Sequence, residues 1–179
     1  MAMVLPVPRF TIDMLDDFPD DGNRYELLEG TLLVTPAPSF NHQSVAARLL
    51  GLLLNAVGNE AHVVGVGAIQ RGNNTQLQPD ILVLPASYSL DAKWRDIRGW
   101  WLAVEVISRS SRVYDREVKR AAYLALGVEE YWIVDPRAES IEIWIPGEAT
   151  SSTVTGVLEW RPRSLRRTIV LDLKKVFAA

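Results

Sequence analysis

The sequence contains no cysteine among its 179 residues. This absence excludes disulfides, cysteine nucleophiles and metal sites built from thiolates, and it suits a reducing compartment. Residues 1–6 also lack a basic segment followed by a long apolar one, so no signal peptide is expected. The longest apolar helical stretch, residues 45–57, is too short and too interrupted to span a bilayer. We therefore expect a cytoplasmic protein without a membrane partner.

A basic net charge is missing as well. The formal net charge is −3, whereas a strongly basic chain would indicate nucleic-acid binding from composition alone. The glycine-rich loop of dinucleotide-binding folds is also absent, because Gly65 and Gly67 are not followed by a further glycine and a helix start. Hydrophobic residues make up 48% of the chain and charged residues 23%. That balance is typical of a globular domain with a real core.

Apolar patterns and turn residues predict an α/β (α+β) fold, a sheet flanked by helices. The pair Glu29-Gly30 between two apolar runs predicts a hairpin over residues 25–34. Helical spacing after a cap at Asn41 predicts a helix that stops at Gly58. Further strands are expected at residues 62–69, 80–84, 100–107, 128–134, 140–145, 154–160 and 168–173, and a second helix at 114–126.

The sequence divides into an N-terminal arm and one domain. Residues 1–23 carry prolines and scattered acids, and we expect an irregular arm there. Residues 24–179 are expected to form a single domain of ordinary size. No internal repeat or low-complexity segment interrupts them.

Residues 100–107 form the most informative stretch, because seven of the eight are apolar and the eighth is Glu105. Such a run predicts a strand buried on both faces. Alternation along the strand puts Glu105 on one face with Trp101, Ala103 and Ile107. An unpaired carboxylate there would cost several kcal/mol, so it needs a cation, a metal or a hydrogen-bond donor. A purely structural partner, an arginine or backbone amides, is the alternative to a functional role.

Two further polar features lie near this strand in the predicted order. Asp80 follows Pro79 at the start of an apolar strand, where turn chemistry is the simpler explanation. Asp115 and Lys119 are spaced i and i+4 on the helix that follows the central strand. An exposed pair of this kind contributes only about 0.3–0.5 kcal/mol. A helix that follows a buried strand after a short polar loop generally packs back on the sheet. That packing would bring one of its side chains near Glu105.

Two carboxylates with a nearby lysine suit metal-assisted hydrolysis. Carboxylate oxygens are ligands of Mg²⁺, which keeps several of its waters. The metal lowers the pKa of a bound water and neutralises charge on a phosphate. A lysine can orient that water and stabilise the developing oxyanion.

Several stretches together resemble the Uma-type endonuclease-like family, a bacterial group in the PD-(D/E)XK nuclease superfamily. They occur in the family's order over roughly residues 24–145. The stretches are residues 25–30 (Tyr-Glu-Leu-Leu-Glu-Gly), His42, residues 78–80 (Gln-Pro-Asp), residues 105–108 (Glu-Val-Ile-Ser), Asp115 with Lys119 and Tyr123, and residues 127–135.

The resemblance implies a restriction-endonuclease-like mixed sheet with helices on both faces. It implies Asp80 and Glu105 as ligands of Mg²⁺, for which Mn²⁺ can substitute. It implies DNA as the substrate and a homodimer as the assembly. Glu26 corresponds to an additional early acid of the family, a ligand or a supporting group. The superfamily's lysine stands two residues after the second acid, where this sequence has Ile107, and the family's lysine maps instead to Lys119.

The leading hypothesis is therefore a Mg²⁺-dependent phosphodiester hydrolase, a DNA endonuclease with Asp80, Glu105, Lys119 and Glu26 as its catalytic residues. The alternative is an inactive nuclease-like fold that binds nucleic acid or a protein, which Ile107 and the acidic charge favour. A third hypothesis, an assembly module, rests on tryptophans expected to be exposed. These are Trp94, Trp100 and Trp144. His42 is expected to form hydrogen bonds at a helix start, Glu26 to face solvent if it has no role, and Tyr123 to fill the core.

Overall fold

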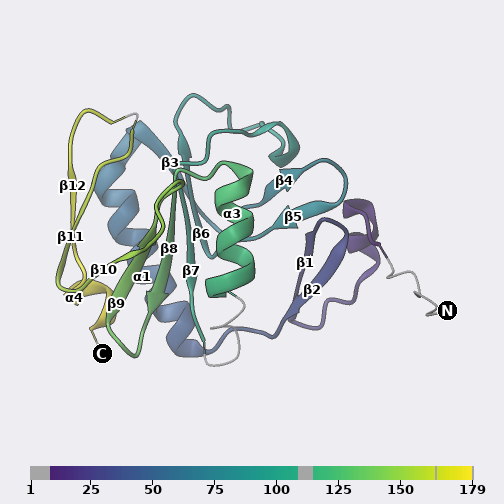
Figure 1. The fold of residues 1–179 in the computed structure, drawn as a ribbon, viewed down its shortest axis with the longest axis horizontal. Helices are drawn as coiled ribbons and strands as arrows, with labels where there is room; N and C mark the ends of the chain where they lie inside the picture. The colour runs from purple at the N-terminus through teal and green to yellow at the C-terminus, as the bar shows by residue number, and fades with distance from the viewer. Residues whose placement is uncertain (1–8, 109–114, 164, 179) are drawn as a thin grey trace.

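The computed structural model describes residues 9–108, 115–163 and 165–178. Its largest element is a six-stranded mixed sheet in the order β10-β9-β8-β7-β6-β3 (Figure 1). The strands are β3 (Ala61–Gly65), β6 (Ile81–Pro85), β7 (Leu102–Val106), β8 (Glu130–Asp135), β9 (Ser140–Trp144) and β10 (Ser152–Val154). β7 pairs in parallel with β8 and antiparallel with β6. The mixed sheet expected from the sequence is thus confirmed.

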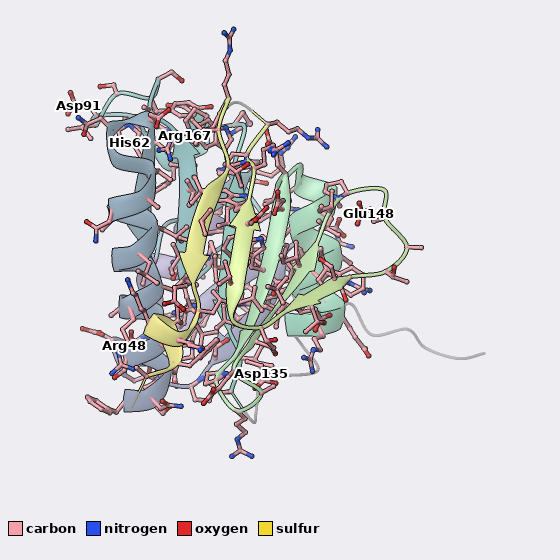
Figure 2. The ribbon with its side chains drawn as sticks, turned by 90° about the vertical axis from the view of Figure 1, so that its left-hand side faces the viewer. Arg48, His62, Asp91, Asp135, Glu148 and Arg167 are labelled. Carbon is pink, nitrogen blue, oxygen red and sulfur yellow. The ribbon has the colours of Figure 1, made fainter. Side chains whose placement is uncertain are left out.

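Strand β7 lies inside this sheet, and all five of its residues are buried. Helix α1 (Phe40–Val57) covers one face of the sheet and helix α3 (Arg120–Leu126) covers the other, as Figure 2 shows with the sheet between them. A strand covered on both faces has no solvent side, which explains why its sequence is apolar almost throughout. The prediction of a doubly buried central strand is confirmed.

The core divides into two clusters, one on each face of the sheet. On the α1 side, Leu49 and Leu53 of the helix pack in one cluster with Val104 of β7 and Trp132 of β8. The hairpin of β11 (Val157–Trp160) and β12 (Ile169–Asp172) and the short helix α4 (Lys174–Phe177) close the same side. Trp160 of β11 meets Trp132 edge to face, with ring centroids 5.3 Å apart. This arrangement gives the C-terminal segment a packing role on that face.

A second, smaller sheet contributes to the other cluster. Its order is β2-β1-β5-β4, with β1 (Arg24–Leu28), β2 (Thr31–Thr35), β4 (Ile69–Arg71) and β5 (Thr75–Leu77). Leu33, Ile69 and Leu77 of this sheet pack in one cluster with Tyr123 of α3 and Ala103 of β7. The smaller sheet therefore lies against the face that carries Glu105.

The hairpin between β1 and β2 is confirmed. Glu29 and Gly30 form its two-residue turn with φ values of 50° and 81°. Positive φ at both central positions is the type I′ geometry, which matches the twist of paired strands. The turn fixes the register of β1 against β2, so it also fixes the positions of Arg24 and Glu26 along the strand.

Several expectations about local structure were wrong. The predicted strand at residues 62–69 is two strands in different sheets, because the chain turns at Val66, which has a φ of 55°. The cap of α1 is Ser39 rather than Asn41, and its side chain accepts a hydrogen bond from the backbone N–H of His42. Trp100 is only 1% exposed, so it offers no assembly surface. Trp101 belongs to the α1-side cluster and does not share the face of Glu105.

The second predicted helix also differs in its first part. Residues Asp115–Lys119 form a π-helical turn, and regular α-helix begins only at Arg120. Position 114, where the prediction began, lies outside the described residues, as does the side chain of Asp115. Gly127 ends the helix in the left-handed conformation with a φ of 94°, as expected of a glycine stop.

The described part of the N-terminal segment contacts the small sheet. Its short 3-10 helix η1 (Ile12–Asp17) is followed by Phe18, whose ring stacks on Tyr25 of β1 with centroids 4.8 Å apart. The N–H of Phe10 also donates to the Gly30 carbonyl at 2.9 Å. A domain boundary between residues 23 and 24 stays a prediction. The remaining short helices are η2 (Gly58–Glu60) and η3 (Trp94–Asp96).

Across the described ranges, every helix is too short or too polar to cross a bilayer.

Candidate active site

The four predicted site residues come from four separate segments and meet at one place. Glu26 lies on β1, Asp80 just before β6, Glu105 on β7 and Lys119 at the end of the π-helical turn. All four are buried, with exposed fractions of 0%, 5%, 3% and 2%. Buried charged side chains are rare unless they are paired, so their meeting indicates one electrostatic unit rather than four surface residues.

Asp80 is held by three donors. Its Oδ2 accepts a hydrogen bond of 2.8 Å from the backbone N–H of Val106 on the neighbouring strand and lies 3.0 Å from Nε2 of His42. Its Oδ1 lies 2.8 Å from Nη2 of Arg24. Burial opposes ionisation of Asp80, but the hydrogen bond from His42 and the charge of Arg24 outweigh it and lower its pKa to about 2. The group is a carboxylate at neutral pH.

Glu105 has the cationic partners that its apolar surroundings require. Nζ of Lys119 donates to its Oε1 at 2.9 Å, and the Tyr123 hydroxyl donates to the same oxygen at 2.8 Å. Nη1 of Arg24 lies 3.9 Å from Oε2. The isolated acid in the sequence is thus one member of a network that links β1, β7 and the helix after β7.

Lys119 lies between two acids. Its Nζ is 2.7 Å from Oε2 of Glu26 and 2.9 Å from Oε1 of Glu105. The alternative of an exposed ion pair on the helix surface is wrong, because only 2% of Lys119 is exposed. The π-helical turn that ends at Lys119 is a rare geometry that is often found at functional sites.

Glu26 faces inward, so a solvent-facing position on the hairpin is wrong. Its Oε1 accepts a hydrogen bond of 2.7 Å from the backbone N–H of Gln78, and its Oε2 contacts Lys119. Gln78 precedes Asp80 by two residues. Glu26 therefore ties the small sheet to the segment that carries Asp80.

Three residues of the network were absent from the predicted site. Arg24 stands two residues before Glu26, and this spacing on a strand places both on one face. Tyr123 stands four residues after Lys119, which places both on one helix face. Those spacings could have revealed them. His42 was expected only to serve the helix start. The family resemblance included it, but no spacing in the sequence indicates that its ring reaches Asp80.

Tyr123 fills the core as predicted and also has a polar role. Burial, together with the nearby charge of Glu105, raises the pKa of its phenol well above its ordinary value of 10.0. The phenol consequently stays protonated and acts as a donor to Glu105. Its ring also packs on Tyr131, with centroids 5.0 Å apart.

A solvent-accessible pocket gives access to the network. Asp80, Glu105, Lys119, Arg24 and His42 all line it, and the other walls come from Asn41 and residues 35–39, 106–108 and 135–137. Asp135 marks the end of β8 at this edge of the sheet (Figure 2). A ligand that enters from solvent would therefore meet the carboxylates and the lysine amine together.

The donor chemistry of this pocket fits a hard divalent cation. Three carboxylates, those of Glu26, Asp80 and Glu105, provide the oxygen ligands that such a cation prefers. Nδ1 of His42 is buried and forms no hydrogen bond with any residue that the structure describes. Among those residues, however, no three of His, Cys, Asp or Glu are already arranged to hold a metal. Asp80 and Glu105 would hold the ion only after a rearrangement of their present partners.

Comparison with known proteins agrees with the fold and the residue pattern. A crystal structure described as "a putative nuclease belonging to DUF820" from Anabaena variabilis superposes with a TM-score of 0.75. The match covers 94% of this chain and 98% of the other, at 15% sequence identity, and so supports the shared fold. No curated protein matches significantly. A family model, Uma2, with the description "Putative restriction endonuclease", matches residues 12–173. Because that match spans nearly the whole chain, this protein belongs to the Uma2 family.

Proposed function

We propose that this protein is a divalent-metal-dependent endonuclease that hydrolyses phosphodiester bonds in DNA. The observation that carries the proposal is the position of the Lys119 amine, 2.9 Å from Glu105 in the pocket that Asp80 also lines. Two carboxylates and a lysine in one accessible pocket suit metal-assisted phosphodiester hydrolysis. The family description supports the same reaction class.

Asp80 and Glu105 would hold the metal, Mg²⁺ or Mn²⁺, through their carboxylate oxygens. When bound, the ion would supply Lewis acidity and lower the pKa of a coordinated water. Every oxygen of Asp80 already has a partner, so the backbone N–H of Val106 would keep the carboxylate oriented while Arg24 gives way.

Lys119 would orient the attacking water and stabilise the negative charge that develops on the phosphate. Glu26 would hold the ammonium in place through its 2.7 Å contact, and the Tyr123 hydroxyl would fix the rotamer of Glu105. Ile107, at the position of the superfamily's lysine, packs in the apolar cluster on the α3 side. Its identity does not argue against catalysis, since Lys119 brings an amine to Glu105 from the next helix.

A non-cleaving nuclease-like protein that binds nucleic acid is the second candidate. One observation favours it: both oxygens of Asp80 are occupied by protein donors and not free for a metal. In that case the buried charges would serve only to join the two sheets.

An assay of supercoiled plasmid cleavage by the protein in the presence of Mg²⁺, Mn²⁺, Ca²⁺ or EDTA distinguishes the two candidate functions. We expect wild-type cleavage with Mg²⁺ or Mn²⁺ and a loss of about 10²–10⁴-fold in Asp80→Asn and Glu105→Gln. Glu148→Gln, in an exposed loop away from the pocket (Figure 2), is the matched control and should retain full activity. Cleavage that persists in Asp80→Asn and Glu105→Gln would refute the proposed site. DNA binding without cleavage under every metal condition would favour the second candidate.

A homodimer also stays a prediction, and light scattering of the purified protein would give its solution mass.

A further inference from the structure

Arg24 lies at the centre of the network, although it belongs to neither the metal ligands nor the catalytic lysine. It stands at the start of β1, and its side chain is 17% exposed and lines the pocket. Nη1 donates to the Gln78 carbonyl at 2.8 Å, and Nη2 lies 2.8 Å from Oδ1 of Asp80. Nη1 also lies 3.9 Å from Oε2 of Glu105. One guanidinium therefore bridges the two carboxylates that the proposed function assigns to the metal.

The charge of this guanidinium is firmly maintained. Burial disfavours the charged form, but the neighbouring carboxylates of Asp80 and Glu105 outweigh burial and raise the pKa of Arg24 above its ordinary value. Lys119 is already engaged by Glu26 and Glu105. Arg24 thus contacts Asp80, whereas Lys119 contacts the two glutamates.

A divalent cation on Asp80 and Glu105 would compete with Arg24. Both cations would be attracted to the same two carboxylates, and at separations of a few ångströms in a partly buried site they would repel each other strongly. Binding of one must weaken the contacts of the other, and this coupling acts equally in both directions. The exposed fraction of Arg24 and its position at the pocket wall leave the side chain a route out toward solvent.

We propose that Arg24 is an exchangeable counter-cation, which holds Asp80 and Glu105 together in the metal-free protein and yields its place when a divalent cation binds. This inference rests on the proposed metal site. In the metal-free state Arg24 offsets the repulsion of two buried carboxylates and keeps the site assembled. After the metal has replaced it, the Arg24 guanidinium stays at the pocket wall. There it can donate two parallel hydrogen bonds to an entering phosphate.

Calorimetric titration with MgCl₂ or MnCl₂ alone, without DNA, tests the exchange. We expect Arg24→Gln to bind the ion about tenfold to a hundredfold more tightly than the wild type, which is the usual range for two coupled sites. Arg137→Gln is the matched control, because it removes a positive charge from the same pocket wall. It should change the affinity less than about threefold, since no described carboxylate pairs with that side chain.

A second measurement covers the case in which Arg24→Gln fails to fold. Arginine side-chain NMR signals of the ¹⁵N-labelled wild type report the same exchange, and Arg24→Lys identifies the signal of Arg24. A guanidinium held by two carboxylates and a carbonyl rotates slowly. We expect its Nη signals to shift and to average as Mg²⁺ is added, while the other arginine signals stay unchanged.

The outcomes separate the inference from the proposed function. Tighter metal binding by Arg24→Gln, or a signal of Arg24 that responds to Mg²⁺, supports the exchange. Equal or weaker binding by a folded Arg24→Gln, with the wild-type signal unmoved by bound metal, would overturn the exchange and leave the metal site standing. If neither protein binds Mg²⁺ or Mn²⁺, both the exchange and the proposed metal site are refuted.

Discussion

The Lys119 ammonium lies 2.9 Å from Oε1 of Glu105, although the two residues are 14 positions apart and belong to different elements. The contact exists because the chain returns from β7 through the π-helical turn to the α3 face of the sheet. The position directly after β7 that could have carried the amine, Ile107, is apolar and 4% exposed. The helix thus provides the amine that the strand does not.

Replacement of Lys119 by Met should impair both stability and activity. Glu26 and Glu105 would lose their shared cation while buried, and breaking one side of a buried ion pair costs about 3–5 kcal/mol. Urea denaturation would measure that loss, and the plasmid assay should show cleavage reduced by about 10²–10⁴-fold. Lys175→Met, at an exposed position of α4, is the control and should alter neither quantity. Wild-type stability in Lys119→Met would contradict the buried network.

The Tyr123 phenol should resist ionisation at alkaline pH. Burial and the charge of Glu105 raise its pKa well above 10.0, so its phenolate should not form while the protein stays folded. Absorbance at the phenolate band during an alkaline titration would report the ionising tyrosines, and Tyr123→Phe should leave the native titration curve unchanged. A reduced amplitude in Tyr123→Phe under native conditions would show that the phenol is accessible and would contradict its donation to Glu105.

Acid should remove a contribution to stability that comes from Asp80. Its pKa is lowered from 3.8 to about 2 on folding, so the carboxylate stabilises the folded protein above 3.8, and this contribution is lost as the pH falls toward about 2. The contribution is about 2 kcal/mol. Asp80→Asn should therefore show a shallower loss of unfolding free energy over this pH interval, measured by denaturation at several pH values. Glu148→Gln serves as the control, and an unchanged slope in Asp80→Asn would count against the paired carboxylate.

Val66 should be a strained position whose replacement stabilises the protein. Its φ of 55° is unfavourable for a β-branched residue, and its side chain is 55% exposed, so little packing would be lost. Val66→Gly should raise the free energy of unfolding by about 1 kcal/mol. Val157→Gly, similarly exposed at 57% but on strand β11, should destabilise instead. Destabilisation of equal size in both variants would show that Val66 is unstrained.

Much of the fold followed from local patterns. The apolar run around Glu105 predicted the buried strand, and the Glu29-Gly30 pair predicted the hairpin, because each signal depends on neighbouring residues. The break between β3 and β4 escaped prediction, since it depends on a backbone conformation at Val66 that a valine rarely adopts. The π-helical turn was not predicted either, because the spacing of its residues is that of an ordinary α-helix.

The candidate site was predicted less completely than the fold. Glu105 could be predicted because an acid in an apolar run needs a partner, whereas Asp80, Lys119 and Glu26 were implied by the family resemblance. The bridge from Arg24 to Asp80 joins residues 56 positions apart, and no local pattern encodes it. The same holds for the ring of His42, which reaches Asp80 only because α1 begins at the edge of the pocket.

The most direct test of the central claim is anomalous scattering from crystals of the wild-type protein soaked in MnCl₂. If Asp80 and Glu105 hold the metal, the anomalous map should contain a peak about 2.0–2.3 Å from a carboxylate oxygen of each residue. The same soak of Asp80→Asn crystals should lose that peak. Protein that cleaves DNA with Mn²⁺ in solution, yet shows no manganese at these two carboxylates in the crystal, would contradict the account.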